Sequence, residues 1–141
     1  MRKHVLTLLA ILAAAGIGYR FGQVNTARAA SGRVFELRTY TTEPGKLDAL
    51  HARFRDHTVA IFNKHHMTSV AYFAPTDEPK SQNTLSYILS FPSREAATKA
   101  WKEFRDDPEW QKVSKESEAN GKIVNHVDSV FAQATDYSPL K

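Results

Sequence analysis

The sequence contains no cysteine, and this absence excludes several kinds of chemistry. Without a thiol, the chain forms no disulfide bond, no zinc–thiolate site and no cysteine nucleophile. The first 29 residues also contain no acidic residue, although Arg2, Lys3, Arg20 and Arg28 lie among them. Of the 19 lysines and arginines, the other 15 equal the 15 aspartates and glutamates, so the net charge of +4 comes from the beginning of the chain. The neutral remainder lacks the basic face that binds phosphates, and we expect no nucleic-acid partner.

The motifs of the common catalytic and cofactor sites are missing as well. The sequence has no glycine-rich phosphate loop, no G-x-S-x-G nucleophile elbow and no H-E-x-x-H zinc motif. His51, His57, His65 and His66 crowd one predicted helix. Because adjacent positions on a helix diverge, these histidines do not converge on one ion. We therefore predict no metal and no cofactor.

The beginning of the chain has the order of a secretory signal peptide. A short basic start is followed by an apolar run over residues 5–18, and Ala27-Arg28-Ala29 has the small-x-small pattern of a cleavage site. These features predict a signal peptide over residues 1–29, a short linker over 30–32 and a folded domain over 33–141. The expected location is secreted or periplasmic.

Two alternatives to cleavage remain open at this point. If the segment is not cleaved, it would anchor the protein in the membrane with the domain facing the periplasm. The run of 14 apolar residues is, however, shorter than the roughly 17–25 that span a bilayer. Membrane contact is then expected only through this N-terminal segment. A mitochondrial presequence also lacks acids, but it is amphipathic and Arg-rich rather than uniformly apolar.

Alternating residues predict the first strand over 33–40. One face of this strand carries Phe35, Leu37 and Thr39, and the other carries Val34, Glu36, Arg38 and Tyr40. Apolar spacing, caps and turn residues predict the remaining elements: a helix from Pro44 to about residues 64–66, strands over 67–74, 84–91 and 123–133, a helix capped by Ser93, and a second helix that begins at Asp107-Pro108 and ends near Asn120-Gly121.

The order β-α-β-β-α-β predicts an α+β, ferredoxin-like fold, in which a four-stranded antiparallel sheet has helices on one face. The other face is then bare and carries Val, Ile, Tyr or Leu in several strands. Apolar faces of this kind usually mark an interface. We therefore predict a homodimer through the sheet face, because a symmetric pair is the most common way to cover such a surface.

Several short motifs resemble those of the NIPSNAP family. They are Arg33 to Tyr40, Glu43 to Lys46 with Leu47 and Phe54, Trp101 with Phe104-Arg105, Asp107 to Trp110, and Thr135 to Pro139. The resemblance covers about residues 33–139. It implies pairing as a dimeric α/β barrel, and the wider superfamily includes cofactor-independent monooxygenases, isomerases and haem-binding proteins.

Candidate site residues come from two groups. His57, Tyr40 and Arg38 are the possible catalytic participants. The second group comprises possible walls of a ligand pocket: Tyr72, Tyr87, Trp101, Trp110, His65 and His126. A polar patch formed by Glu36, Arg38 and Tyr40 together with His126 and Asp128 is a further possibility, with an interfacial charge network as its alternative.

These observations leave two functions of different classes. The first is a non-catalytic dimeric module that binds a small apolar ligand or a protein partner. The second is a cofactor-independent enzyme of the monooxygenase or isomerase type, with its site in a cleft between sheet and helices. An enclosed polar cavity would favour the enzyme, whereas a dry apolar interior without a cavity would exclude it. The sequence does not identify a substrate.

Overall fold

The structure is a computed structural model and describes residues 32–140. The predicted leader over 1–29 and most of the predicted linker lie outside these residues. In chain order the elements are β1 (Val34–Thr42), α1 (Leu47–Arg53), the π-helical turn η2 (Phe54–Thr58), α2 (Val59–Lys64), β2 (Thr68–Phe73), the short 3₁₀ helix η3 (Lys80–Gln82), β3 (Thr84–Phe91), α3 (Arg94–Asp106), α4 (Pro108–Ser117) and β4 (Val124–Ala132).

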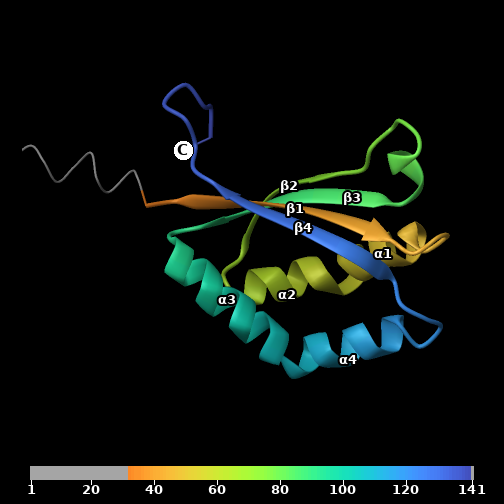
Figure 1. The fold of residues 1–141 in the computed structure, drawn as a ribbon. Coiled ribbons are helices and arrows are strands. Elements are labelled where there is room, and N and C mark those ends of the chain that lie inside the picture. The colour runs from red at the N-terminus through yellow and green to blue at the C-terminus, as the bar shows by residue number, and fades with distance from the viewer. Residues whose placement is uncertain (1–31, 141) are drawn as a thin grey trace, which may run out of the picture. The chain divides into compact units, whose positions relative to one another are not determined.

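The four strands form one antiparallel sheet in the order β2-β3-β1-β4, and the helices lie on one side of it (Figure 1). This confirms the predicted α+β, ferredoxin-like fold. The sequence alone does not fix which strands of the sheet are neighbours. In the structure β1 and β4 are direct neighbours, with Phe35 opposite Ala132 and Tyr40 opposite Val127.

The two faces of β1 divide as the alternation predicts. Trp101 from α3 contacts Glu36, and Phe54 from η2 packs against Tyr40, so these strand residues face the helices. Leu37 lies on the opposite face and is 43% exposed. The tyrosines of the sheet, which the sequence analysis placed partly on the bare face, instead turn toward the helices in a cluster with Phe54.

The first helical segment differs from the prediction in its start and in its regularity. Pro44 was expected in the first helical turn, but it lies in the preceding turn, where Gly45 has a φ of +72°. The helix begins at Leu47 and passes through the π-helical turn η2 before α2. The Thr58 hydroxyl donates a hydrogen bond to the carbonyl of Arg53, five residues earlier, at 3.1 Å. A π turn holds more residues than an α turn, so the residues after it lag behind their α-helical positions.

The second helical layer follows the predicted caps. The Ser93 hydroxyl accepts a hydrogen bond from the Ala96 amide at 3.1 Å and begins α3. The Asp107 carboxylate accepts one from the Glu109 amide at 2.8 Å and begins α4, with Pro108 at its first position. The helix α4 ends at Ser117, before the predicted stop, and a turn then leads to Gly121 with a φ of +103°.

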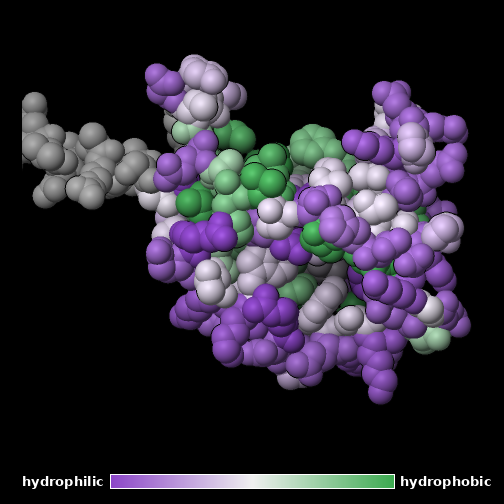
Figure 2. Space-filling model, viewed as in Figure 1, coloured by the Kyte–Doolittle hydropathy of each residue, from purple (hydrophilic) through white to green (hydrophobic). Residues whose placement is uncertain are grey.

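The core lies between the sheet and the helices, and its largest fully buried side chains include Tyr87, Phe62, Phe91 and Leu50. Among the described residues, the outer face of the sheet exposes large apolar side chains, with Leu37 43%, Phe73 53% and Val130 60% exposed, whereas Phe35 on the same face is buried. Figure 2 shows hydrophobic side chains gathered along the sheet, whereas the helical side is mostly hydrophilic. Within residues 32–140, no helix combines the length and apolarity needed to cross a bilayer.

Candidate functional site

A cavity of about 170 Å³ lies between the sheet and the helices. Its lining residues come from the strands β1 and β4, from the segment formed by α1, η2 and α2, from α3, and from α4 with the turn after it. They are Tyr40, Arg53, Phe54, Thr58, Phe62, Phe104, Trp110, Ser114, Glu118, Val124 and Val127. A wider depression of about 550 Å³ lies on the outside of α4, lined by side chains such as Lys112, Lys115 and Glu116. Because the smaller cavity lies between the sheet and the helices and is lined by aromatic residues, whereas the depression is lined mainly by polar and charged side chains, we place the candidate site in the smaller cavity.

Aromatic rings form much of the cavity wall. Phe104 and Trp110 lie with their ring centroids 4.4 Å apart, and Phe54 and Phe62 contact each other edge to face at 6.1 Å. The π-helical turn supplies both Phe54 and the buried Thr58 to the same wall. Single π turns within helices frequently occur at functional sites, which agrees with this position.

Arg53 is the charged residue most deeply buried in the cavity wall, at 6% exposed. Its Nη1 donates hydrogen bonds to the Ser117 hydroxyl and to Glu118 Oε1, both at 3.3 Å. The guanidinium carbon lies 5.5 Å from the centroid of the Trp110 ring. Because Glu118 balances the charge of Arg53, the wall of the cavity is polar at this end without a net charge.

Glu36 is the centre of a second buried network, beside the cavity. The residue is 1% exposed, and its carboxylate accepts three hydrogen bonds. The donors are Trp101 Nε1 at 2.5 Å, the Ser129 hydroxyl at 2.6 Å and Arg38 Nη1 at 2.8 Å. The Arg38 guanidinium also stacks on Trp101, 4.3 Å from the ring centroid.

Tyr40 joins this network to the cavity. Its hydroxyl oxygen accepts a hydrogen bond from Tyr87 at 3.0 Å and a longer one from Arg38 Nη2 at 3.4 Å. Burial raises the pKa of the Tyr87 phenol well above its ordinary value, and the neighbouring Tyr40 raises it further. Burial disfavours the charge of Arg38, but Tyr40, Tyr87 and Glu36 outweigh it and raise the pKa of the guanidinium. Tyr87 is therefore a neutral donor, and Arg38 stays charged.

The predicted aromatic pocket residues lie on the helix side of the sheet, but only Trp110 is among the residues that line the cavity. Trp110 lines the cavity, whereas Trp101 is engaged by Glu36. Tyr72 and Tyr87 stack with ring centroids 5.7 Å apart, and Tyr72 also contacts Phe54 at 6.0 Å. Burial raises the pKa of the Tyr72 hydroxyl, which shares a hydrogen bond with Ser69 at 2.6 Å.

The structure does not bring the three candidate histidines to the cavity. His57 is exposed on η2 and lies apart from the pair formed by Arg38 and Tyr40. His126 contacts Asp128 at 3.1 Å and is 65% exposed at its side chain. These two residues pair with Thr41 and Thr39, so they lie on the bare face, opposite to Tyr40. The predicted polar patch of Glu36, Arg38 and Tyr40 with His126 and Asp128 is therefore wrong, and Ser129 takes their place beside Glu36.

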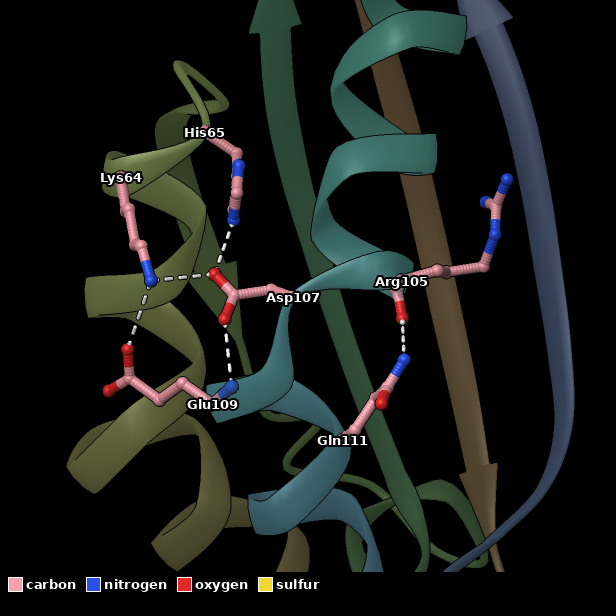
Figure 3. A network of polar contacts seen from close by, with 6 residues as sticks. All are labelled: Lys64, His65, Arg105, Asp107, Glu109 and Gln111. Atoms are coloured by element: carbon pink, nitrogen blue, oxygen red, sulfur yellow. Dashed lines mark hydrogen bonds and ion pairs between the residues drawn. The ribbon is translucent and has the colours of Figure 1, made fainter.

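His65 belongs to a polar network that joins α2 to α4 (Figure 3). Its Nε2 contacts Asp107 Oδ2 at 2.6 Å, and Lys64 Nζ contacts the same oxygen at 2.8 Å. The hydrogen bonds from Lys64 and His65 hold the pKa of the Asp107 carboxyl well below its usual range. Since Asp107 also caps α4, this network fixes the helices around the cavity but does not line it.

Sequence reasoning missed Arg53, Thr58 and Glu118 as cavity residues. In the sequence, Thr58 is a polar residue between the apolar Phe54 and Ile61 of the first helical segment, and Arg53 directly precedes Phe54. A charged residue beside a stripe is usually solvated, and the ion pair with Glu118 joins residues 65 positions apart. Within the described residues, no group of three His, Asp or Glu side chains is arranged to hold a metal ion.

The fold and the cavity define a ferredoxin-like α+β protein with an internal space between sheet and helices. The pattern of the NIPSNAP family matches residues 35–139, and the chain belongs to that family. This confirms the resemblance inferred from the short motifs. A search of curated proteins finds no match to the chain.

Solved structures with the same fold include further NIPSNAP proteins. A NIPSNAP family protein from Agrobacterium tumefaciens has a TM-score of 0.68 at 19% identity, over 77% of this chain and 99% of that chain. An uncharacterized NIPSNAP-like domain protein from Burkholderia xenovorans has a TM-score of 0.67 at 16% identity, over 77% and 90%. SnoaB, a cofactor-independent oxygenase from Streptomyces nogalater, has a TM-score of 0.51 at 14% identity, over 77% and 99%. At these identities the likeness concerns the fold alone.

Proposed function

We propose that this NIPSNAP protein is a small-ligand-binding module that acts as a homodimer in the cell envelope. The observation that carries the binding function is the cavity of about 170 Å³ between sheet and helices. An apolar protein cavity of about 150 Å³ holds one benzene molecule. The ligand is therefore a compact molecule of about one ring.

The chemistry of the wall favours an uncharged apolar body. Phe54, Phe62, Phe104 and Trp110 supply aromatic surface, and the one buried cation in the wall, among the described residues, is paired with Glu118. A charged ligand loses its hydration on entry without gaining an opposite unpaired charge. A ring-sized apolar molecule instead gains contacts with these aromatic rings.

Calorimetry and melting with isopropylbenzene test this proposal. The protein is recovered from cells that express the full chain, and the hydrocarbon is added at increasing concentration. Binding to the folded state raises the melting temperature, and the shift grows with ligand concentration. Trp110 lines the cavity and serves as a fluorescence reporter, and Trp110→Phe removes this response. No heat, no shift and no fluorescence change with any one-ring probe rejects the binding function.

Two substitutions on the same helix give a matched control. Ser114→Phe places a ring in the cavity that Ser114 lines, whereas Lys115→Phe adds a ring on the outside of α4. We expect Ser114→Phe to abolish isopropylbenzene binding and Lys115→Phe to retain it. Equal loss in both variants indicates a general disturbance of α4 rather than occupation of the cavity.

The uncovered face of the sheet supports the homodimer. Leu37 and Val130 pair across β1 and β4, and both are exposed, as is Phe73 on β2. The apolar side chains of the neighbouring strands together form one exposed apolar face. Contiguous apolar faces of this kind usually mark interfaces. A second copy of the chain is the occupant that covers it with matching chemistry, because the same face is present on both.

Catalysis without a cofactor is the second candidate for the same cavity. The observation in its favour is that polar groups, Tyr40, Arg53 and Thr58, reach an otherwise aromatic wall. SnoaB shares the fold and is a cofactor-independent oxygenase. An oxygen electrode distinguishes the two functions: the binding module consumes no O₂ when electron-rich one-ring phenols are added, whereas an oxygenase does. Tyr40→Phe abolishes uptake if Tyr40 takes part.

The location in the cell envelope rests on the sequence of residues 1–29. Its basic start, apolar run and small-x-small site support export followed by cleavage after Ala29. N-terminal sequencing of the protein recovered from the periplasm tests this point. A mature chain that begins at Ala30 is the expected result, and an intact Met1 in the membrane fraction supports the anchor instead.

A further inference from the structure

The Tyr40 hydroxyl has a hydrogen that no other described residue accepts. Two contacts reach its oxygen, and in both the oxygen is the acceptor: one from Tyr87 at 3.0 Å and one from Arg38 Nη2 at 3.4 Å. A guanidinium has no acceptor, so Arg38 cannot take the hydrogen of Tyr40. Tyr87 uses its own hydrogen in the contact, so it is the donor of that pair.

The surroundings hold this one-way arrangement in place. Tyr87 is 1% exposed, so no bulk water competes for its hydroxyl. Arg38 is fixed on its other side by Glu36, through the 2.8 Å contact from Nη1, and by stacking on Trp101. A phenol oxygen with both acceptor positions engaged directs its remaining O–H bond away from those two donors. Tyr40 itself lines the cavity.

We infer that the ligand of the cavity carries a neutral acceptor oxygen, such as a carbonyl, that receives the Tyr40 O–H. This inference rests on the proposed binding function and names the chemical class of the ligand. Both nearby cations already have carboxylate partners, Arg38 with Glu36 and Arg53 with Glu118. A ligand carboxylate therefore finds no unbalanced charge among them, whereas a ketone or aldehyde oxygen needs only the one donor that Tyr40 offers.

The size of the cavity and the position of this donor together select one-ring carbonyl compounds. The aromatic wall offers contacts to a ring, and the inferred carbonyl oxygen lies at the hydroxyl of Tyr40, a residue that lines the cavity. A matched pair of probes separates the two contributions. Acetophenone and isopropylbenzene have nearly the same shape, but only the ketone accepts a hydrogen bond.

The test is calorimetric titration of both probes into the protein and into two variants, Tyr40→Phe and Tyr72→Phe. Tyr40→Phe keeps the ring that contacts Phe54 and Tyr87 but removes the donor. Tyr72→Phe is the control, because Tyr72 belongs to the same aromatic cluster without lining the cavity. We expect acetophenone to bind about tenfold more weakly to Tyr40→Phe, the effect of one hydrogen bond. Isopropylbenzene is expected to bind all three proteins equally.

Each other outcome decides a different question. If acetophenone binds Tyr40→Phe as tightly as the unmodified protein, while both probes bind, the role of Tyr40 is overturned and the binding function stands. If neither probe binds the unmodified protein, the proposed function fails, and this inference fails with it. If Tyr40→Phe loses isopropylbenzene too, the infrared carbonyl stretch of acetophenone in the unmodified protein decides instead. A shift to lower frequency than in hydrocarbon solvent supports the hydrogen bond, and an unshifted band overturns it.

Discussion

Trp101 Nε1 donates a hydrogen bond to the carboxylate of Glu36 at 2.5 Å, and this contact ties α3 to the centre of the sheet. The same indole ring supports the guanidinium of Arg38, which is the other partner of Glu36. The buried ion pair therefore gains neutral contacts from Trp101 and Ser129 as well as its own attraction. These donors satisfy the carboxylate of Glu36, whereas Nε of Arg38 is buried without a hydrogen-bond partner among the described residues.

Removal of Glu36 is expected to destabilise the fold strongly. Glu36→Ala leaves Arg38 buried without its counter-charge, and such uncompensated charges cost about 3–5 kcal/mol. Ser129→Ala removes one neutral donor and is expected to cost about 1 kcal/mol. Urea denaturation gives both free energies of unfolding. If both variants lose the same small amount, the network does not stabilise the fold as the geometry indicates.

The contribution of Asp107 to stability is expected to depend on pH. Contacts from Lys64 and His65 lower the pKa of Asp107 in the folded state below the value of about 3.9 that it has when unfolded. The charged form therefore stabilises the fold above about pH 4, and this stability is lost as the pH falls toward the lowered pKa. Asp107→Asn keeps a helix cap but loses the charge. We expect the free energy of unfolding to differ from that of the unmodified protein at pH 7, to differ less at pH 3, and to converge further as the pH falls toward the lowered pKa.

Asp106 provides the control for this measurement. It also contacts a lysine, Lys102, but its side chain is 60% exposed. Exposed pairs contribute little to stability, so Asp106→Asn is expected to unfold at nearly the same urea concentration as the unmodified protein. A difference for Asp107→Asn that stays constant from pH 7 to pH 3 contradicts the role of its ionised form.

A charge on the bare face of the sheet is expected to separate the proposed dimer. Val130→Asp places a carboxylate on each copy on the apolar face, on the edge strand β4 next to Leu37. Its burial without a partner is unfavourable, so sedimentation velocity is expected to show a monomer. Thr98→Asp on the outside of α3 is expected to leave the dimer intact. An unmodified protein that sediments as a monomer at high concentration argues against the pairing itself.

Truncation of Trp110 is expected to enlarge the cavity. Its ring packs on Phe104 with centroids 4.4 Å apart, and Trp110→Ala removes that contact. The expected cost is about 2–3 kcal/mol, below the range for fully buried tryptophan because Trp110 is half-buried. Thermal melting in the presence of two-ring hydrocarbons is expected to show stabilisation of this variant but not of the unmodified protein. Stabilisation of both proteins alike indicates that Trp110 does not limit the size of the ligand.

The fold was predictable because its signals are local. Alternation in residues 33–40 fixed the two faces of β1, and Ser93 and Asp107 fixed the starts of α3 and α4. Such caps and periods act within a few residues, so one sequence is enough to read them.

The cavity was not predictable, because it depends on contacts across the chain. Arg53 and Glu118 are separated by 65 positions, and only the folded arrangement pairs them. His126 was assigned to the wrong group because its face depends on the register of β4 against β1. A shift of one residue in that register reverses every side chain of the strand. Trp110, one of the residues predicted to form a pocket wall, does line the cavity.

The π-helical turn η2 restricts how the length of the first helical segment can change. Deleting one residue there converts the π turn to α-helical spacing and keeps the later residues in place relative to Leu50, whereas a deletion elsewhere in the segment rotates them by about 100°. Ile61 and Phe62, each 1% exposed, then leave their places against the sheet. A change of length in this helical segment outside the π turn therefore alters the wall of the cavity, whereas the connection over residues 74–83 supplies none of the cavity's lining residues.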